Sequence, residues 1–293
     1  MRRLERRVAV VTGGAGGIGR AMGVAFARAG MHVVLADVVP ERLTAVVDDL
    51  RGDGLDVIGV PTDVTDYASV EALRDAAVAT YGAVHVVCNN AGIGAGAEGR
   101  QWEHDLRDWE WAFAVNVWGV IHGINAFVPT LLAQDDEGHI VNTSSGNGGV
   151  SPLPSTPQYA ATKAAVVTIT ECLYAQLQEV SDKVSASVLF PGPHMLRTGL
   201  FESWRTRPDR FAKQRPRRTP YTTVEQLEEQ MRAAGVEPEY TDPSEVADQV
   251  VDALRTRTFW IQPASDRIDD MIRARAESML KRENPAYLRA VPG

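Results

Sequence analysis

A tyrosine and a lysine four residues apart are the side chains in this sequence best suited to acid–base chemistry. Tyr159 and Lys163 lie in a segment, residues 158–180, whose pattern predicts a helix, so both share one helix face. The pKa of a phenol is ordinarily about 10, and a neighbouring ammonium lowers it. Such a tyrosine can give a proton to a carbonyl oxygen or take one from an alcohol. The same spacing also occurs in ordinary exposed helices, so position must decide.

Two serines precede this pair, in a loop rich in glycine, serine and proline. Ser144 and Ser145 follow residues 139–143, an apolar run that predicts a buried strand. A serine hydroxyl there can donate a hydrogen bond to an oxygen on which negative charge develops. The sequence leaves open which serine does so.

The chain opens with a glycine-rich turn between an expected strand and an expected helix, within residues 12–19. Residues without a Cβ let the backbone turn tightly and approach a pyrophosphate group. The start of the helix supplies unpaired N–H groups and a partial positive charge. The turn therefore predicts dinucleotide binding. The residues expected at the cofactor are Gly13, Gly16, Gly17, Ile18 and Gly19.

Asp37 ends the second expected strand and suggests which dinucleotide binds. A carboxylate at this position hydrogen-bonds the ribose hydroxyls of NAD, and it would repel the 2′-phosphate of NADP. Neither the glycine turn nor residues 38–40 contain a lysine or arginine that could compensate. We therefore expect NAD, with NADP less favoured. The alternative is that Asp37 only caps the helix that starts near Pro40.

Short apolar segments and longer helical ones alternate along the chain, and this order predicts the fold. Continuous apolar strands separated by helices indicate a parallel sheet covered on both faces, with ligands bound beyond the carboxyl ends of the strands. We expect a single doubly wound, Rossmann-like α/β domain over residues 1–293, with a seven-stranded parallel sheet. A long helical stretch, residues 106–133, should be interrupted or kinked near Pro129. The expected strands are residues 8–11, 32–36, 57–60, 84–88, 139–143, 184–190 and 259–261.

Composition excludes several classes of function. The 293 residues are 44% hydrophobic and 23% charged, which is typical of a globular protein, and the net charge of −8 argues against a nucleic-acid binder. Cys88 and Cys172 form no CxxC pair, and the histidines lack metal-ligand spacing, so we predict reduced thiols and no metal. No apolar stretch approaches a membrane span or a signal-peptide core. We expect a cytoplasmic protein with no membrane partner.

Further motifs follow the glycine turn in a characteristic order. Asn89-Asn90-Ala91-Gly92 follows the fourth expected strand, Asn116 lies in the next helix, and Pro191-Gly192 follows the sixth strand. Together with Ser145 and the Tyr159–Lys163 pair, this order resembles the short-chain dehydrogenase/reductase family. The resemblance covers about residues 8–198 and, more loosely, residues 242–261.

The resemblance implies roles for the reacting residues. Tyr159 is the general acid/base, and Lys163 binds the nicotinamide ribose and lowers the pKa of Tyr159. Ser145 orients the substrate oxygen, and Asn116 holds a water that links Lys163 to solvent. In the family the serine usually precedes the tyrosine by thirteen residues, whereas Ser145 precedes Tyr159 by fourteen. One extra residue in the loop, around residues 152–157, would preserve the geometry.

The resemblance also implies cofactor contacts. Asp63 and Val64 border the adenine, and Pro191-Gly192 faces the nicotinamide. Thr198 bonds the carboxamide, although its spacing from Pro191-Gly192 is longer than usual. The residues expected to form the cofactor wall and support the sheet are Asn90, Ala91 and Gly92.

The segment after the sixth strand points to the substrate. Residues 195–241 are polar and Arg-rich, and we expect them to form a long substrate-covering insertion, with residues 262–293 as a C-terminal extension. A long cover suggests a bulky substrate. A weaker similarity links the chain to bacterial members that oxidise benzylic or other bulky secondary alcohols. The hypothesis is NAD-dependent interconversion of a bulky hydrophobic secondary alcohol and its ketone.

Assembly and the basic run are two further points. In the family, the helices carrying Asn116 and Tyr159 form a four-helix interface, so we expect a homodimer or homotetramer. Tryptophans around Asn116 fit packing or an interface better than a substrate wall. The basic run 205–218 either pairs with acids such as Glu225, Glu228 and Glu229 or attracts an anionic substrate.

Two other functions share part of this pattern. Sugar-nucleotide epimerases and dehydratases also carry YxxxK, but their glycine motif is usually TGxxGxxG, whereas this chain has TGxxxGxG. A non-catalytic NAD-binding redox sensor would typically lack the tyrosine or the lysine, and both are present here.

Overall fold

Parallel strands form one sheet at the centre of the computed structural model, which describes residues 1, 3–94, 100–215, 221 and 223–289. The sheet has seven strands in the order β3-β2-β1-β4-β5-β6-β7, and all neighbouring strands are parallel. Valine-rich sequences favour extended backbone, and β1 and β5 are buried along their whole length. The strands are β1 Val8–Thr12, β2 His32–Asp37, β3 Val57–Pro61, β4 Val86–Asn89, β5 Gly138–Thr143, β6 Val184–Leu189 and β7 Trp260–Ile261.

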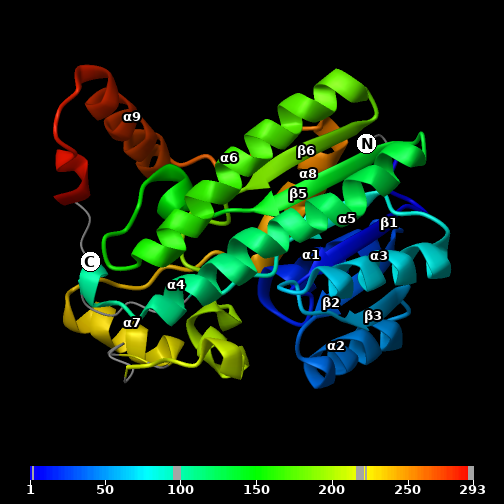
Figure 1. Cartoon of the computed structure of the whole chain (residues 1–293), viewed down its shortest axis with the longest axis horizontal. Helices are drawn as coiled ribbons and strands as arrows, with labels where there is room; N and C mark the ends of the chain where they lie inside the picture. The colour runs from blue at the N-terminus through cyan, green and yellow to red at the C-terminus, as the bar shows by residue number, and fades with distance from the viewer. Residues whose placement is uncertain (2, 95–99, 216–220, 222, 290–293) are drawn as a thin grey trace.

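Helices cover both faces of this sheet, because alternate strand residues point to opposite faces (Figure 1). One apolar core joins the sheet to α1, α2 and α8, and a second joins it to α3, α5 and α6. Ala9 and Val11 belong to the first core, whereas Val8 and Val10 belong to the second. The covering helices are α1 Gly17–Arg28, α2 Pro40–Gly52, α3 Tyr67–Tyr81, α5 Gly119–Ala133, α6 Pro157–Val180 and α8 Pro243–Thr256.

The predicted doubly wound fold is therefore confirmed, and the long helical stretch needs a correction. Residues 106–133 form α4, Leu106–Phe113, then a π-helical turn, Ala114–Trp118, and then α5. The helix continues through Pro129, so the predicted interruption there is wrong. The buried side chains of Phe127 and Leu131 anchor α5 on both sides of the proline. The irregularity of this stretch is instead the π-helical turn, which contains Asn116.

The stretch Leu106–Ala133 is also long and apolar enough to cross a membrane by length and composition alone. Half of its most apolar window is buried inside the molecule, where α5 packs against α3 and the sheet. The prediction that no apolar stretch approaches a membrane span is therefore wrong by length and composition, and the apolar character of this stretch is that of a core helix.

Short elements connect β6 to α8. They are the 3-10 helices η4, Gly199–Thr206, and η5, Asp209–Phe211, followed by α7, Val224–Ala233. We call residues 195–215 the covering segment. In Figure 1 α7 is drawn at the lower left of the molecule, and α9, Asp266–Lys281, projects away from the body at the upper left. That residues 195–241 form an insertion stays a prediction.

Candidate active site

The glycine turn joins β1 to α1 in a conformation that only glycine adopts easily. Gly13 and Gly17 have positive φ angles of 67° and 49°. A Cβ on Gly19 would lie 2.1 Å from the carbonyl oxygen of Gly13, so the helix and the turn meet too closely for any side chain. A Cβ on Gly16 would meet no atom within 4 Å, so the turn is open on that side.

This open side suits an anionic group. Helix α1 begins at Gly17 without a side-chain cap and without an acid in its first turn. The first N–H groups of α1 therefore face the open side of the glycine turn, which we call the glycine cradle. The positive end of the helix dipole lies at the same place. The residues present fit the pyrophosphate of a dinucleotide. Ile18 is half-buried and packs on the first core, so it supports this helix start from below.

Asp37 lies at the carboxyl end of β2, next to the same turn. Its carboxylate accepts hydrogen bonds from the backbone N–H of Ala15 at 3.1 Å and of Val39 at 3.1 Å. The helix-cap alternative is not what these bonds show, because α2 has no side-chain cap. The carboxylate instead ties the glycine turn to the end of β2, where it can meet a ribose.

Asn90, Ala91 and Gly92 form the wall beyond β4. The Thr12 hydroxyl accepts hydrogen bonds from the backbone N–H groups of Asn90 and Ala91, both at 3.0 Å, and the Asn90 side chain donates to the Thr12 carbonyl. A Cβ on Gly92 would lie 3.4 Å from Nζ of Lys163. This wall therefore connects the glycine turn with the tyrosine–lysine pair.

Asp63 and Val64 follow β3 at the same edge of the sheet. The Asp63 Oδ1 atom accepts from the N–H of Thr65 at 2.9 Å and from its hydroxyl at 2.7 Å. Burial raises the pKa of the Asp63 carboxyl, but the hydrogen bonds from Thr65 and Arg210 outweigh it and leave the pKa lowered. Val64 is buried against Gly119 of α5, which holds this turn in place.

Ser145, Tyr159 and Lys163 come together above the carboxyl end of β5. The hydroxyl of Ser145 hydrogen-bonds the phenol of Tyr159. Nζ of Lys163 lies 5.7 Å from the centroid of the Tyr159 ring and donates to the Thr143 carbonyl at 2.8 Å. Ser144 points elsewhere, because its buried hydroxyl donates to the main-chain carbonyl of Lys163 at 2.8 Å. The geometry thus favours Ser145 as the serine that faces a substrate.

Burial governs the protonation of this pair. It raises the pKa of the Tyr159 phenol, and the hydrogen bond with Ser145 offsets part of that rise. It also lowers the pKa of Lys163 to about 8, because the ammonium is almost completely removed from water. The predicted lowering of the Tyr159 pKa by Lys163 stays a prediction.

Asn147 holds together the loop between Ser145 and Tyr159. The backbone N–H of Asn147 donates to the Ser145 hydroxyl at 3.2 Å, and its side chain bonds both Thr156 and the N–H of Leu153. Gly148 has a φ of 99°, so the chain reverses here. Sequence reasoning missed Asn147, and its position inside the loop of unusual length was the available signal.

Asn116 lies in the π-helical turn and is completely buried. Its Oδ1 accepts from the N–H of Ile93 at 2.8 Å, and its Nδ2 donates to the Ile93 carbonyl and to the Thr162 hydroxyl, both at 3.0 Å. Thr162 in turn donates to the Tyr159 carbonyl at 2.7 Å. Asn116 therefore fastens the wall beyond β4 to the helix that carries Tyr159. Its role in holding a water stays a prediction.

Pro191-Gly192 and Thr198 lie beyond β6, whose last residue is Leu189. Phe190 extends the pairing by donating from its N–H to Ile261, so Pro191-Gly192 leaves the sheet at its carboxyl edge. A Cβ on Gly17 would lie 2.9 Å from Cγ2 of Thr198. Thr198 therefore lies over the glycine turn. The predicted bond from Thr198 to a carboxamide stays a prediction.

Acids that sequence reasoning did not select hold the covering segment. Arg207 donates to the completely buried carboxylate of Asp108 at 2.5 Å, and Lys213 lies 3.0 Å from the same carboxylate. The backbone N–H groups of Gln214 and Arg215 donate to Asp105. Of the acids expected to pair with the basic run, Glu228 instead pairs with Arg197 and Arg232. Within the described part of the run, residues 205–215, the acids found as partners are Glu202, Asp63, Asp105 and Asp108. Arg217 and Arg218 lie outside the described residues.

Comparison with known proteins matches this arrangement to a family. The short chain dehydrogenase family model matches residues 7–209, which span the glycine turn, Tyr159 and Lys163. The chain belongs to the short-chain dehydrogenase family. A short-chain dehydrogenase/reductase from Burkholderia phymatum, solved in complex with NAD, is 38% identical with a TM-score of 0.87, over 97% of this chain and 98% of that one.

Curated members of the family extend the comparison. A 1-deoxy-11-beta-hydroxypentalenate dehydrogenase from Streptomyces avermitilis is 39% identical over 64% of this chain and 69% of its own length. A C alpha-dehydrogenase from Sphingobium is 31% identical over 72% of this chain and 67% of its own length. This short-chain dehydrogenase is therefore an oxidoreductase with an NAD-binding Rossmann fold.

Proposed function

We propose that this short-chain dehydrogenase interconverts a bulky, hydrophobic secondary alcohol and its ketone with NAD, using Tyr159 as the general acid/base. The observation that carries the proposal is the Ser145–Tyr159 hydrogen bond beside Lys163, at the same sheet edge as the glycine cradle. The names of the pentalenate and Cα relatives, both dehydrogenases, support action on a hydroxyl group.

The residues of the site divide the work between them. The Ser145 hydroxyl holds the substrate oxygen against the phenol, where Tyr159 takes the proton of the alcohol or returns it to the ketone. Lys163 stabilises the phenolate that forms, because its ammonium lies against the ring. When bound, the nicotinamide supplies the hydride acceptor. Asn116 keeps the helix of Tyr159 in register with the cofactor wall.

The cofactor is tested by titration with NADH and NADPH, for the wild type and for Asp37→Ala. The carboxylate of Asp37 predicts clear preference for NADH, and the alanine variant should narrow it, since the repulsion of a 2′-phosphate is removed. Equal or tighter binding of NADPH to the wild type would contradict this assignment. Absence of binding by both would contradict the dinucleotide site itself.

The substrate class is tested by comparing alcohols of different bulk. With NAD in excess, kcat/KM for a benzylic or polycyclic secondary alcohol should exceed that for propan-2-ol. The bulk of the alcohols oxidised by the relatives is the variable that this comparison probes. Turnover of propan-2-ol as fast as the bulky alcohols would overturn this part of the proposal.

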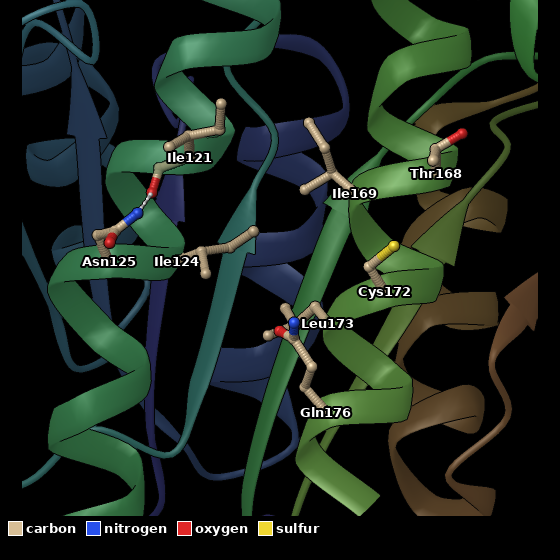
Figure 2. Close-up of a pocket in the computed structure, with 8 residues that line it drawn as sticks. All are labelled: Ile121, Ile124, Asn125, Thr168, Ile169, Cys172, Leu173 and Gln176. Atoms are coloured by element: carbon tan, nitrogen blue, oxygen red, sulfur yellow. Dashed lines mark hydrogen bonds between the residues drawn. The ribbon is translucent and has the colours of Figure 1, made fainter.

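We also propose that the protein is a homo-oligomer built on α5 and α6. Figure 2 shows a groove between these helices at which isoleucines from both point toward each other. Its lining residues are Ile121, Ile124, Asn125, Thr168, Ile169, Cys172, Leu173 and Gln176. Such an apolar groove fits the four-helix interface that the family resemblance implies. Light scattering should give a dimer or tetramer for the wild type and a smaller species for Ile169→Asp.

A further inference from the structure

The covering segment contacts the cofactor side of the molecule at several separate points. Thr198 lies over Gly17 of the glycine turn, as described above. Further along, the Ser203 hydroxyl accepts a hydrogen bond at 3.1 Å from the N–H of Gly94, beyond β4. Finally, Arg210 of η5 reaches the turn after β3. The segment thus runs along the carboxyl edge of the sheet from β6 to β3 and passes over the glycine turn.

The last of these contacts is an ion pair with the acid expected beside the adenine. The Arg210 guanidinium donates to Oδ2 of Asp63 at 3.1 Å and also to the Thr65 hydroxyl. Oδ1 of Asp63 is already occupied by Thr65, so Oδ2 is the atom left for a partner from outside the turn. Arg210 is 147 residues away along the chain, so the pair depends on the folded covering segment.

The backbone around Arg210 is held firmly from behind. Arg207 donates to the Phe211 carbonyl at 2.6 Å and binds the buried carboxylate of Asp108. Lys213 binds the same carboxylate. These contacts fix η5 on α4, so Arg210 projects from a braced turn and little backbone entropy is lost when it pairs with Asp63.

We propose that Arg210 is a cofactor-retaining residue, whose pairing with Asp63 latches the covering segment over the adenine end of the groove. Release of NAD(H) then requires this pair to break. The proposal rests on the proposed NAD-dependent function, because it takes Asp63 as the residue that borders the adenine.

The rate of NADH dissociation tests the latch. NADH is displaced by excess NAD in a stopped-flow instrument, with nicotinamide fluorescence as the signal, for the wild type, Arg210→Ala and Arg205→Ala. Arg205 is the matched control, because it lies in the same segment and its contacts, with Glu202 and the ring of Trp204, are local. A half-exposed ion pair predicts dissociation about two- to five-fold faster for Arg210→Ala and unchanged for Arg205→Ala. High salt should shrink the difference, since it screens the pair.

A double-mutant cycle separates the latch from a general loosening of the segment. Asp63→Asn keeps an Oδ1 acceptor for Thr65 but removes the charge that faces Arg210. The effects of Asp63→Asn and Arg210→Ala on the dissociation rate should be less than multiplicative in the double variant. Multiplicative effects on the NADH dissociation rate would overturn the latch. So would an Arg210→Ala variant that releases NADH at the wild-type rate. Neither result would contradict NAD binding itself.

Hydrogen exchange of the protein without cofactor provides a readout independent of NADH. Amides of residues 199–211 should exchange faster in Arg210→Ala than in the wild type and Arg205→Ala. Unchanged exchange would overturn the latch. If the wild type binds no NADH at all, the proposed NAD-dependent function is wrong. Arg210 then cannot retain the cofactor, even if its substitution changes the hydrogen exchange of the segment.

Discussion

The two sides of the active site are held together by different forces. The sheet side, with the glycine turn and the Ser145–Tyr159 pair, rests on buried apolar strands and on backbone positions where only glycine fits. In the covering segment no residue of η4 or η5 is buried, and arginine and lysine hold the segment on the carboxylates of Asp63 and Asp108. We therefore expect the sheet side to be rigid and insensitive to salt, and the covering segment to open without unfolding the domain.

The largest effect should come from the sheet side, where we propose that the Tyr159 hydroxyl transfers the proton. Tyr159→Phe should lower kcat by about 10²- to 10⁴-fold, because the proton donor and acceptor is lost. NADH affinity, measured by fluorescence titration, should change little. Tyr174→Phe is the matched control, since Tyr174 lies on the same helix but packs edge-on against Phe259. Turnover of Tyr159→Phe at the wild-type rate would exclude the proposed mechanism.

The next effect tests the covering side. Asp108→Asn leaves Arg207 and Lys213 without their buried counter-charge, which typically destabilises by about 3 kcal/mol or more. We expect the covering segment to detach, so that limited proteolysis cuts within residues 199–215 far faster than in the wild type. The far-ultraviolet circular dichroism of the sheet and its helices should be kept. If thermal unfolding and proteolysis match the wild type, the buried carboxylate does not hold the segment.

A pair of glycine variants separates packing from cofactor binding within the sheet side. Gly19→Ala forces a Cβ against the Gly13 carbonyl and should lower the free energy of unfolding by roughly 1–3 kcal/mol. Gly16→Ala places its Cβ in open space, so stability should be kept while NADH binding weakens. Chemical denaturation and NADH titration of both variants make the comparison. Equal stability of both would show that the turn tolerates a side chain that the geometry forbids.

The smallest effect is a pH dependence of the free energy of unfolding that comes from Lys163 on the sheet side, and not from the covering segment. Lys163 has its pKa lowered by burial to about 8, against about 10.5 in the unfolded chain, so the unfolded state binds more protons between these values. The energetic penalty of the buried charge is therefore full below about pH 8 and is relieved as the pH rises.

The measurement compares the wild type with Lys163→Met. From pH 8 to 10, the free energy of unfolding of the wild type should gain about 1 kcal/mol per pH unit relative to the variant. The raised pKa of Tyr159 acts in the opposite sense only above about pH 10. A flat difference across this window would contradict the burial of a charged Lys163.

Much of the sheet side could be predicted because its signals are local. Alternation of apolar strands with helices predicted the parallel sheet, and the glycine turn, Asp37 and the Tyr159–Lys163 spacing predicted the place of the site. The error at Pro129 arose because a missing N–H is a local signal, whereas packing of Phe127 and Leu131 keeps the helix continuous. The π-helical turn at Asn116 left no comparable local mark.

By itself, the sequence determined the order of strands and helices, the glycine turn and the residue types at the carboxyl edge of the sheet. Only the tertiary structure favours Ser145 over Ser144, since the bond from Ser144 to the Lys163 carbonyl depends on how β5 meets α6. It also assigned Arg207 and Arg210 to Asp108 and Asp63, acids about one hundred or more residues earlier in the chain. Hydrophobic periodicity depends on residues that are close together in the sequence, so it can be recognised there. The pairing of distant charges depends on their separation in space, which is set only when the chain has folded.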